Sequence, residues 1–390
     1  MEFAGKIAAA YNTEEQCRRA ACIKPGGDNM DKLKERVKIK NIWTKNRIAV
    51  PPMVCFHWSD DNGCVTDKNL QHYRDMAAGG AGLIIAEATA VTKRGRLHET
   101  QLGLWEDKQT EGWKRLADAV HQYDVPFFVQ LHHAGVSGIE KNADCPSDYS
   151  FRDSNGELRA RGCEMSPERV REVIDDFVQA ARRAKQAGLD GIELHGCHSY
   201  LICQFFNRNI NHREDIYGQR REKFALDILE GIRESCGEDF VAGIRLGAFE
   251  PALEDGIEHA LSLAGKADFL DISYGFGGES ISLRPEGYPF SEAIYGAQEI
   301  KKRLPDMPVF GVDGITDGEM AEKAILQTGV DMIDVGRGFL VNPNFGNDVL
   351  EGRSCGKCLH CRPACKWSPF LNDGTVVCPG RNLFLRNQKQ

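Results

Sequence analysis

The chain has 390 residues, of which 42% are hydrophobic and 27% are charged, and its formal net charge is -8. This composition predicts a globular protein with one large α/β domain, and its short, scattered basic clusters argue against a nucleic-acid surface. The sequence has no apolar run of membrane-spanning length and no signal peptide, so we expect a cytoplasmic protein with reduced cysteines.

Residues 1–32 are expected to form an N-terminal extension. Most of this stretch is polar and alanine-rich, is punctuated by Pro25, Gly26 and Gly27, and has no periodic apolar pattern long enough for a core of its own. We therefore predict three parts: this extension, a barrel-forming domain over residues 33–350, and a cysteine-rich segment over residues 351–390.

From Arg47 onward, short apolar runs alternate with amphipathic stretches, as in strand–helix units around a parallel sheet. From Ser166 to Gln186, for example, apolar residues recur at a spacing of about 3.6, which predicts a helix. Eight such units predict a (β/α)8 TIM barrel; a doubly wound sheet is the alternative, but no G-x-G-x-x-G turn follows an early strand. The predicted strands are Arg47–Pro51, Gly82–Glu87, Pro126–Gln130, Gly191–Leu194, Phe240–Arg245, Phe269–Ser273, Val309–Val312 and Met332–Val335.

The fourth predicted strand ends in the stretch His195-Gly196-Cys197-His198-Ser199-Tyr200. Barrels of this type carry their chemistry at the carboxyl ends of the strands. If the backbone turns helically there, both imidazoles face one side and can donate hydrogen bonds to one oxygen, while Tyr200 adds a weak acid. The trio suits a site that polarises a carbonyl and protonates the neighbouring carbon. A two-histidine metal site and purely structural histidines are the alternatives.

Other strand ends indicate an anion site. Gln130 and Arg245 close the third and fifth strands, and the seventh and eighth strands end in Val312-Asp313-Gly314 and Gly336-Arg337-Gly338. Barrels commonly bind phosphate after these last two strands, where glycines admit backbone N–H groups and an arginine adds charge-assisted hydrogen bonds. The alternative is that these are ordinary turn glycines.

Five of the fourteen cysteines lie close to the C-terminus: Cys355, Cys358, Cys361, Cys365 and Cys378. The spacing Cys358-x2-Cys361-x3-Cys365, followed by Cys378, predicts an iron-sulfur cluster. A four-cysteine zinc site usually has two C-x2-C pairs and is the first alternative; free thiols or disulfides are the second. Cys355 can compete with Cys358 for the first ligand position.

Seven stretches in order give the chain a resemblance to the Old Yellow Enzyme family of FMN-dependent ene-reductases. Within that family it resembles the branch that carries an iron-sulfur cluster, with 2,4-dienoyl-CoA reductase and 2-enoate reductase as relatives. The resemblance covers about Leu33 to Arg386. The stretches are Asn46–Met53, Gly82–Ala88, Val129–Gly135, His195–Leu201, Asn211–Gly218, Gly336-Arg337 and the C-terminal cysteines.

The resemblance implies a cofactor and a reaction. FMN would lie across the barrel mouth, in contact with Pro52, Met53, Ala88, Gln130 and Arg245, with its phosphate held by Gly314, Gly336 and Arg337. His195 and His198 would bind the carbonyl oxygen of an α,β-unsaturated substrate, the flavin would deliver hydride to the β-carbon, and Tyr200 would protonate the α-carbon. Cys358, Cys361, Cys365 and Cys378 would bind a 4Fe-4S cluster.

Three residues depart from the family pattern. Val54 stands where the family often has a flavin-tuning cysteine or threonine, and Cys55, one residue later, should face the opposite side of an extended segment. Asp313 replaces a glycine and would repel phosphate unless it points away. The dienoyl-CoA reductases have a second acidic histidine after strand six, but Ser273–Gly278 contains none. This favours simple enone or enoate reduction.

The relatives continue into an FAD and NAD(P)H-binding half, which this chain does not include. We therefore expect electrons from a ferredoxin or flavoprotein partner, with NAD(P)H bound directly over the flavin as the alternative. Two other functions stay open: an oxidative amine demethylase, which would carry FMN on a cysteine at the position of Val54, and a non-catalytic electron-transfer subunit with a structural metal. The sequence leaves open the choice among steroid-like enones, aryl acrylates and flavonoids, and whether the chain forms homo-oligomers.

Overall fold

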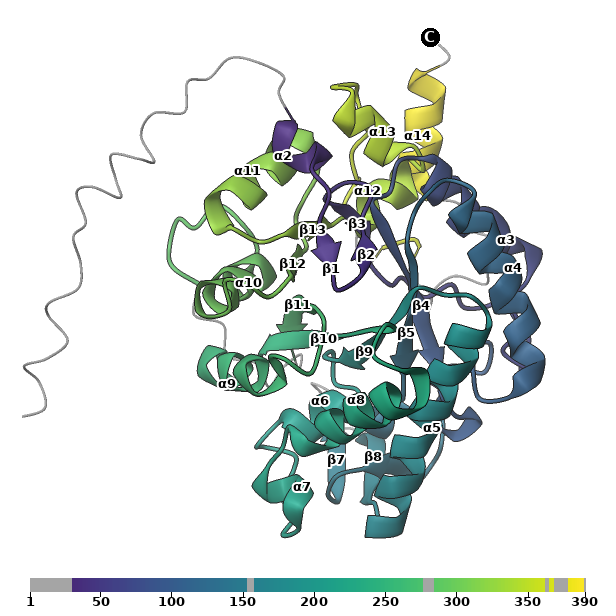
Figure 1. Cartoon of the computed structure of the whole chain (residues 1–390), viewed down its shortest axis with the longest axis vertical. Helices are drawn as coiled ribbons and strands as arrows, with labels where there is room; N and C mark the ends of the chain where they lie inside the picture. Colours follow the sequence, from purple (N-terminus) through teal and green to yellow (C-terminus); the bar gives the residue numbers. More distant parts are fainter. Residues whose placement is uncertain (1–29, 153–157, 276–283, 362–364, 368–377, 389–390) are drawn as a thin grey trace, which may run out of the picture.

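The computed structural model describes residues 30–152, 158–275, 284–361, 365–367 and 378–388. Eight parallel strands close into a barrel with helices around it (Figure 1). This confirms the predicted (β/α)8 barrel, and each predicted strand overlaps one barrel strand. In barrel order the strands are β3 (Ile48–Val50), β4 (Leu83–Ala90), β5 (Phe127–His132), β9 (Gly191–Gly196), β10 (Val241–Phe249), β11 (Leu270–Gly275), β12 (Val309–Val312) and β13 (Met332–Asp334).

The longer helices around the barrel bury one face each. In α5 (Pro167–Gln186), the Ser166 side chain accepts the N–H of Arg169 as N-cap, and the buried residues include Val170, Val173 and Phe177, which confirms the predicted helix. The others are α2 (Asp31–Lys34), α3 (Asp67–Ala78), α4 (Thr110–His121), α6 (Leu201–Phe206), α7 (Ile216–Gln219), α8 (Lys223–Cys236), α9 (Leu253–Leu263), α10 (Glu292–Arg303), α11 (Gly318–Thr328), α12 (Gly336–Val341), α13 (Phe345–Leu350) and α14 (Pro379–Asn387).

The barrel interior changes character along its strands. At the amino ends, Phe128, Phe269 and Phe310 stack with ring centroids 5.7 and 5.0 Å apart, and Ile39 of the hairpin β1 (Lys38–Ile39) and β2 (Ile42–Trp43) closes this apolar layer. Since strand side chains alternate between two faces, the residues two positions beyond an interior phenylalanine also point inward. These positions include Gln130 and Asp271, so the interior becomes polar toward the carboxyl ends.

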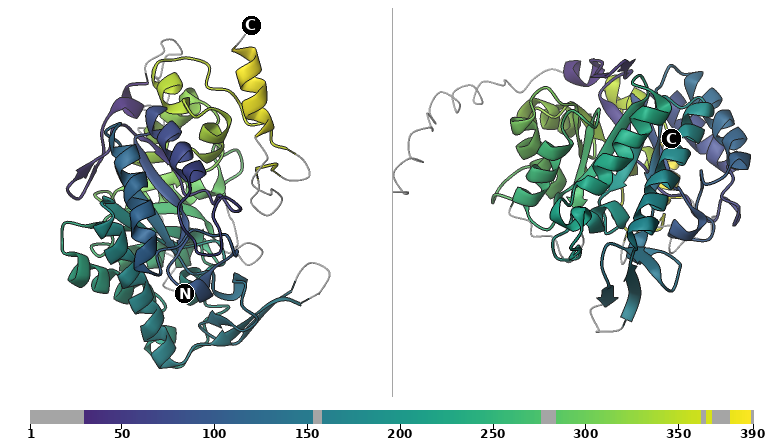
Figure 2. Two further views of the ribbon diagram at one scale, coloured as in Figure 1. Left: turned by 90° about the vertical axis from the view of Figure 1, so that its right-hand side faces the viewer. Right: turned by 60° about the horizontal axis from the view of Figure 1, so that its bottom comes forward.

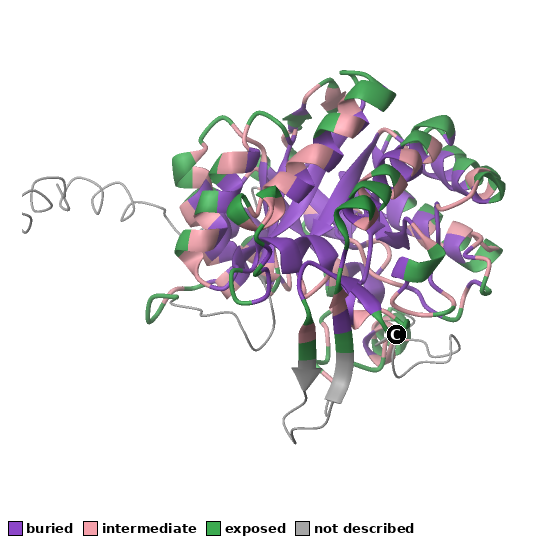
Figure 3. Ribbon diagram, turned by 90° about the horizontal axis from the view of Figure 1, so that it is seen from below, coloured by how far each residue is buried: buried purple, intermediate pink, exposed green. Residues whose placement is uncertain are grey.

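A small sheet interrupts the barrel between β5 and α5. It comprises β6 (Ala143–Cys145), β7 (Tyr149–Arg152) and β8 (Leu158–Glu164) in the order β6-β8-β7, and the sequence analysis did not predict it. The sheet projects from the barrel, whose strands are buried while exposed residues lie on the outer faces of the helices (Figures 2 and 3).

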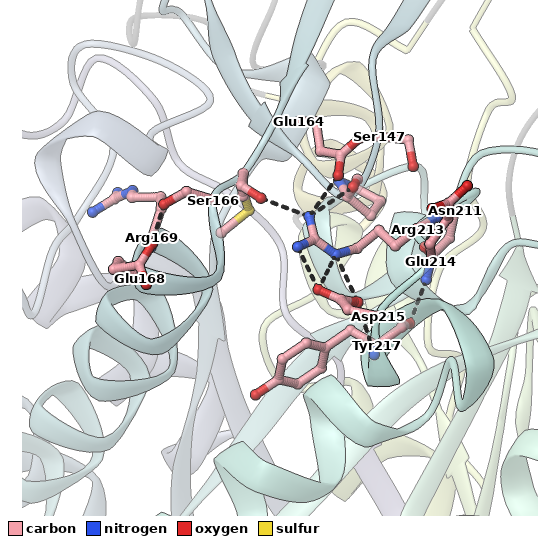
Figure 4. Close-up of polar contacts among 12 residues, drawn as sticks. Ser147, Glu164, Ser166, Glu168, Arg169, Asn211, Arg213, Glu214, Asp215 and Tyr217 are labelled. Atoms are coloured by element: carbon pink, nitrogen blue, oxygen red, sulfur yellow. Dashed lines mark hydrogen bonds and ion pairs between the residues drawn. The ribbon is translucent and has the colours of Figure 1, made fainter.

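The buried guanidinium of Arg213 ties this sheet to the loop before α7. It donates hydrogen bonds to the carbonyl oxygens of Pro146 (3.0 Å) and Met165 (2.6 Å), which follow β6 and β8. It also forms a two-pronged ion pair with Asp215, in which Nη2 lies 2.6 Å from Oδ2 and Nε lies 3.1 Å from Oδ1 (Figure 4). The stretch Asn211–Gly218, which is part of the family resemblance, therefore has a structural role here: it holds the small sheet in place.

The described parts of the cysteine-rich segment pack on the barrel beside α12 and α3. Helix α14 lies against α12 (Figure 1), and Trp367 contacts the rings of His72 on α3 (5.9 Å between centroids) and Trp58 (5.7 Å). At the start of the predicted barrel domain, the N–H groups of Lys32 and Leu33 donate to the Glu322 carboxylate of α11, each at 2.9 Å. The division at residues 33 and 351 stays a prediction. Among the described helices, none has the length and apolar character needed to cross a membrane.

Candidate active site

A pocket opens where β3, β12 and β13 end. Six of the eight residues predicted to hold FMN line it together with Asp313 and Asp334. The other two do not line this pocket: Ala88 is buried on β4, and Gln130 is buried on β5, where its amide donates to Glu193 Oε1 at 2.8 Å. The six are Pro52, Met53, Arg245, Gly314, Gly336 and Arg337.

Two glycines shape the outer end of this pocket. Gly314 has φ of +80°, a backbone conformation that glycine adopts without strain, and its surroundings are open. A Cβ on Gly336 would lie 2.9 Å from Met53 Sδ, so a side chain there would have to displace the Met53 side chain. The two glycines thus leave backbone N–H groups open to the pocket, as a bound phosphate requires. A side chain at either position would obstruct them.

Asp313 and Arg337 form an ion pair at the rim of the pocket. Their Oδ1 and Nη2 atoms are 2.5 Å apart, and the two side chains are 58% and 44% exposed. The carboxylate that we expected to repel phosphate therefore faces the arginine. An exposed pair of this kind contributes about 0–1 kcal/mol, so an anionic ligand can take the arginine from the aspartate at little cost.

The floor of the pocket is a buried cluster of three carboxyl groups and Arg245. Arg245 Nη1 lies 3.2 Å from Asp271 Oδ2, while Glu193 and Asp334 are 0% and 1% exposed. Burial and the Asp271 carboxylate raise the pKa of both Glu193 and Asp334 well above their usual values, against the opposing effect of Arg245. Among the described residues, no donor makes a well-aligned hydrogen bond to the Asp271 and Asp334 carboxyl oxygens, and Arg245 contacts Asp271 only as an ion pair. A proton held between these carboxyls satisfies them best.

Replacing Asp334 by asparagine is expected to stabilise the flavin-free protein near neutral pH. A carboxyl whose folded pKa is raised makes the folded state bind more protons than the unfolded state, so stability falls as pH rises above the unfolded pKa of about 4. Asp334→Asn removes this loss and adds amide donors for Asp271. We expect a gain of about 1–3 kcal/mol and a flatter dependence of melting temperature on pH between about pH 5 and 9.

The control for this prediction is Asp306→Asn, an exposed aspartate in the loop before β12. It should leave the pH dependence of melting unchanged. A lower melting temperature for Asp334→Asn at neutral pH would show that Asp334 is ionised and well paired in the folded protein.

The predicted histidines belong to a row of hydrogen-bonded side chains. His132 Nδ1 lies 3.0 Å from His195 Nδ1, His195 Nε2 lies 3.1 Å from His198 Nδ1, and His198 Nε2 lies 2.6 Å from Ser273 Oγ. Burial lowers the pKa of His132 and His198 to about 3 and that of His195 well below its usual value. All three rings are therefore neutral near pH 7, each with one N–H donor and one acceptor nitrogen.

Tyr200 packs its ring against this row. The ring centroids lie 4.4 Å from that of His132 and 4.7 Å from that of His195. Burial raises the pKa of the phenol, which therefore keeps its proton near pH 7. The structure thus gathers Tyr200, His195 and His198, and adds His132, which the sequence analysis did not propose although it follows Gln130 by two positions and so shares its face of β5.

The backbone between the two histidines does not turn as a right-handed helix, as the sequence analysis assumed. His198 and Ser199 have φ of 61° and 69°, in the left-handed region. Such conformations cost about 1–2 kcal/mol for a residue with a Cβ, and they cluster at functional sites. The left-handed turn brings the His198 ring back against His195.

Replacing Ser199 by glycine is expected to stabilise the protein by about 0.5–1 kcal/mol. Glycine removes the free-energy cost of the left-handed backbone. This gain exceeds the destabilisation that comes from the larger conformational entropy of glycine in the unfolded state. Thermal and urea unfolding would measure the change. The matched control is Gly188→Ser, at a position with φ of +84° and open space around it, where the reverse substitution should destabilise by a similar amount. If Ser199→Gly destabilised the protein, the left-handed backbone at Ser199 would not be a source of strain.

Cys55 lies behind the pocket. Its N–H donates to Glu87 Oε2 of β4 at 2.8 Å, and burial raises the pKa of its thiol. Neither Cys55 nor Val54 lines the pocket.

The C-terminal cysteines are spread along the segment. Cys358 Sγ accepts the N–H of His360 at 3.5 Å, Cys361 and Cys378 are half-buried, and Cys365 is exposed. Across the described ranges, no three of these sulfurs lie within 4.8 Å of one another. Cys355 is set apart: it is 7% exposed, and its Sγ lies 3.8 Å from the carbonyl oxygen of Thr316.

Comparison with known proteins identifies the family. The family model for the NADH:flavin oxidoreductase / NADH oxidase family matches residues 32–355. The NADH oxidase of Thermoanaerobacter brockii is 36% identical over 84% of this chain, which spans about half (52%) of that protein. The NADPH dehydrogenase of Listeria monocytogenes serotype 4a (strain HCC23) is 37% identical over 83% of this chain and 95% of its own length.

Among solved structures, a 2-naphthoyl-CoA reductase in complex with 2-naphthoyl-CoA superposes with a TM-score of 0.76 and 25% identity, over 89% of this chain and 58% of that one. These findings confirm the resemblance to the Old Yellow Enzyme family. The chain therefore belongs to the NADH:flavin oxidoreductase / NADH oxidase family and is an FMN-dependent oxidoreductase.

Proposed function

We propose that the protein is an FMN- and 4Fe-4S-dependent ene-reductase that reduces the C=C bond of an α,β-unsaturated carbonyl compound. The observation that carries the proposal is the protonated Tyr200 phenol packed against neutral His195 and His132, on the same barrel mouth as the pocket. FMN, when bound, supplies hydride to the β-carbon of the substrate. An enone or enoate is the substrate class that the residues favour.

The histidines polarise the substrate. Either His195 or His198 can donate an N–H to the carbonyl oxygen once it releases its bond within the row, and a neutral imidazole donates without adding a buried charge. Tyr200 then gives its proton to the α-carbon. Two protein groups thus stabilise the negative charge that hydride addition places on the substrate oxygen and carbon.

The residues of the pocket fit FMN. Arg245 Nε is buried and has no hydrogen-bond partner in the described part of the chain, so it can donate to a carbonyl oxygen of the flavin ring. Gly314, Gly336 and Arg337 would hold the phosphate, with Asp313 giving up its arginine. Pro52 and Met53 would pack on the ring, and we propose Ala88 and Gln130 as further contacts from the strands across the mouth.

Cys358, Cys361, Cys365 and Cys378 are proposed to bind the 4Fe-4S cluster. The N–H of His360 donated to Cys358 Sγ supports this, because such hydrogen bonds are typical of cluster sulfurs. Cys355 is buried, and its Sγ lies 3.8 Å from the carbonyl oxygen of Thr316, so Cys358, which is half-buried and accepts the N–H of His360, is the better first ligand. Electrons would come from NAD(P)H or from a reduced ferredoxin or flavoprotein.

A second substrate class has one specific observation in its favour. The structural neighbour is a 2-naphthoyl-CoA reductase by name, which suggests conjugated aryl acyl thioesters as candidates. Residues 276–283, which follow β11 in the sequence, fall outside the described residues.

The test is anaerobic purification followed by absorption spectroscopy and measurement of iron, sulfide, zinc and flavin. One releasable FMN with about four irons, and turnover of an enone with a chemical reductant, would support the proposal. Covalently bound flavin would favour the amine demethylase, and zinc without flavin would contradict the cluster and the reaction together. Rapid enone reduction with NADH alone would remove the need for a protein electron donor.

A further inference from the structure

His195, Cys197 and His198 each have a potential metal-ligand atom, and these three atoms lie within 4.8 Å of one another. No other group of three such residues is found in the part of the chain that the structure describes. His195 Nε2 and His198 Nδ1 are 3.1 Å apart, and Cys197 Sγ lies 3.3 Å from His198 Nδ1. In tetrahedral zinc sites, Zn–N bonds of about 2.0–2.1 Å and Zn–S bonds of about 2.3 Å give edges of about 3.3–3.6 Å. Two of the three edges, at 3.1 and 3.3 Å, are therefore close to those of a zinc tetrahedron, and the third, between His195 and Cys197, is within 4.8 Å.

The outer nitrogens of both histidines already have the partners that a metal site needs. His195 Nδ1 is hydrogen-bonded to His132, and His198 Nε2 to Ser273. Such outer contacts fix the ring orientation of metal-binding histidines. His195 Nε2 and His198 Nδ1, which are hydrogen-bonded to each other, are the nitrogens that a metal would take. The metal would replace the hydrogen bond between the two rings.

We propose that His195, Cys197 and His198 bind a Zn²⁺ ion, and that zinc inhibits the enzyme by occupying the histidines that bind the carbonyl substrate. The inhibition rests on the proposed function, whereas the binding site does not. On binding, Zn²⁺ forms one bond to sulfur and two to nitrogen, and the Cys197 thiol releases its proton to solvent. Three protein ligands leave a fourth position for water. The neighbouring Arg245 is paired with Asp271 (3.2 Å), which reduces its repulsion of the metal.

The site is tested by cobalt titration of the full-length protein with its cysteine-rich segment intact. Co²⁺ bound to a thiolate gives a charge-transfer band, and the difference between wild type and Cys197→Ala isolates the contribution of this site, because both proteins keep the C-terminal cysteines. Cys236→Ala, on α8, is the matched control and should give the wild-type spectrum. A band that is weaker in Cys197→Ala alone supports the site, and identical spectra in all three proteins overturn it.

The inhibition is tested by steady-state kinetics with an enone and added Zn²⁺. We expect the apparent KM to rise with unchanged kcat, recovery on chelation, and at least about tenfold weaker inhibition of Cys197→Ala, whose metal-free activity should match wild type. Equal inhibition of both proteins overturns the proposal. If no enone is reduced, the proposed function fails, and the cobalt titration still decides the metal site.

Discussion

Tyr200→Phe is expected to slow the oxidation of reduced enzyme by an enone by about 10²–10⁴-fold, the usual contribution of a positioned general acid. The phenylalanine ring keeps the contacts that Tyr200 makes with His132 (4.4 Å) and His195 (4.7 Å), so the change removes the proton donor and little else. Reduction of the flavin by NAD(P)H or a chemical reductant should proceed at the wild-type rate. Anaerobic stopped-flow absorbance separates these two half-reactions.

The control is Tyr295→Phe on α10, whose ring packs against Tyr288 at 5.2 Å. It should leave both half-reactions unchanged. If Tyr200→Phe is oxidised by the enone as fast as wild type, the proton comes from another group or from water, and the role of Tyr200 would be limited to packing.

The barrel could be predicted because its strands are buried on both faces. Such strands read as continuous apolar runs, as in Val309–Val312, and their order fixes which strand ends meet at the mouth. That rule predicts that Arg245, Gly314, Gly336 and Arg337 lie together at the mouth, and all four line the pocket.

The acidic floor and the left-handed turn could not be predicted in the same way. Asp271 and Asp334 are single acidic residues in mainly apolar strands, and whether such a residue faces the interior or the helices depends on the register of the barrel. The turn at His198 and Ser199 lacks the glycine that usually signals positive φ. Tertiary contacts, which no local pattern encodes, impose it.

The sheet of β6, β7 and β8 shows a third limit of sequence patterns. Its strands β6 and β7 have 3 and 4 residues, too few for a clear alternation. Their arrangement depends on an arginine far along the chain, because Arg213 binds the carbonyl groups that follow β6 and β8.

Arg213→Ala is therefore expected to destabilise the protein by about 1–3 kcal/mol, the cost of leaving buried carbonyl oxygens without a donor. The Arg213 side chain is 3% exposed in its pair with Asp215. Its removal leaves that carboxylate and the carbonyl oxygens of Pro146 and Met165 without their donor. Arg213→Lys should recover part of the loss, because an ammonium keeps the charge but cannot bond two carbonyls and both carboxylate oxygens in the same planar arrangement.

Urea unfolding with a matched surface control decides the origin of this loss. Arg171 pairs with Glu168 on α5 at 2.8 Å, with side chains 63% and 70% exposed, and Arg171→Ala should change stability by less than about 0.5 kcal/mol. Both substitutions remove one arginine charge. The two arginines differ in their burial and in the backbone carbonyl groups that only Arg213 binds. Equal effects of the two substitutions would mean that the Arg213 contacts contribute no more than a surface ion pair, and that the sheet is held to the barrel by its apolar packing.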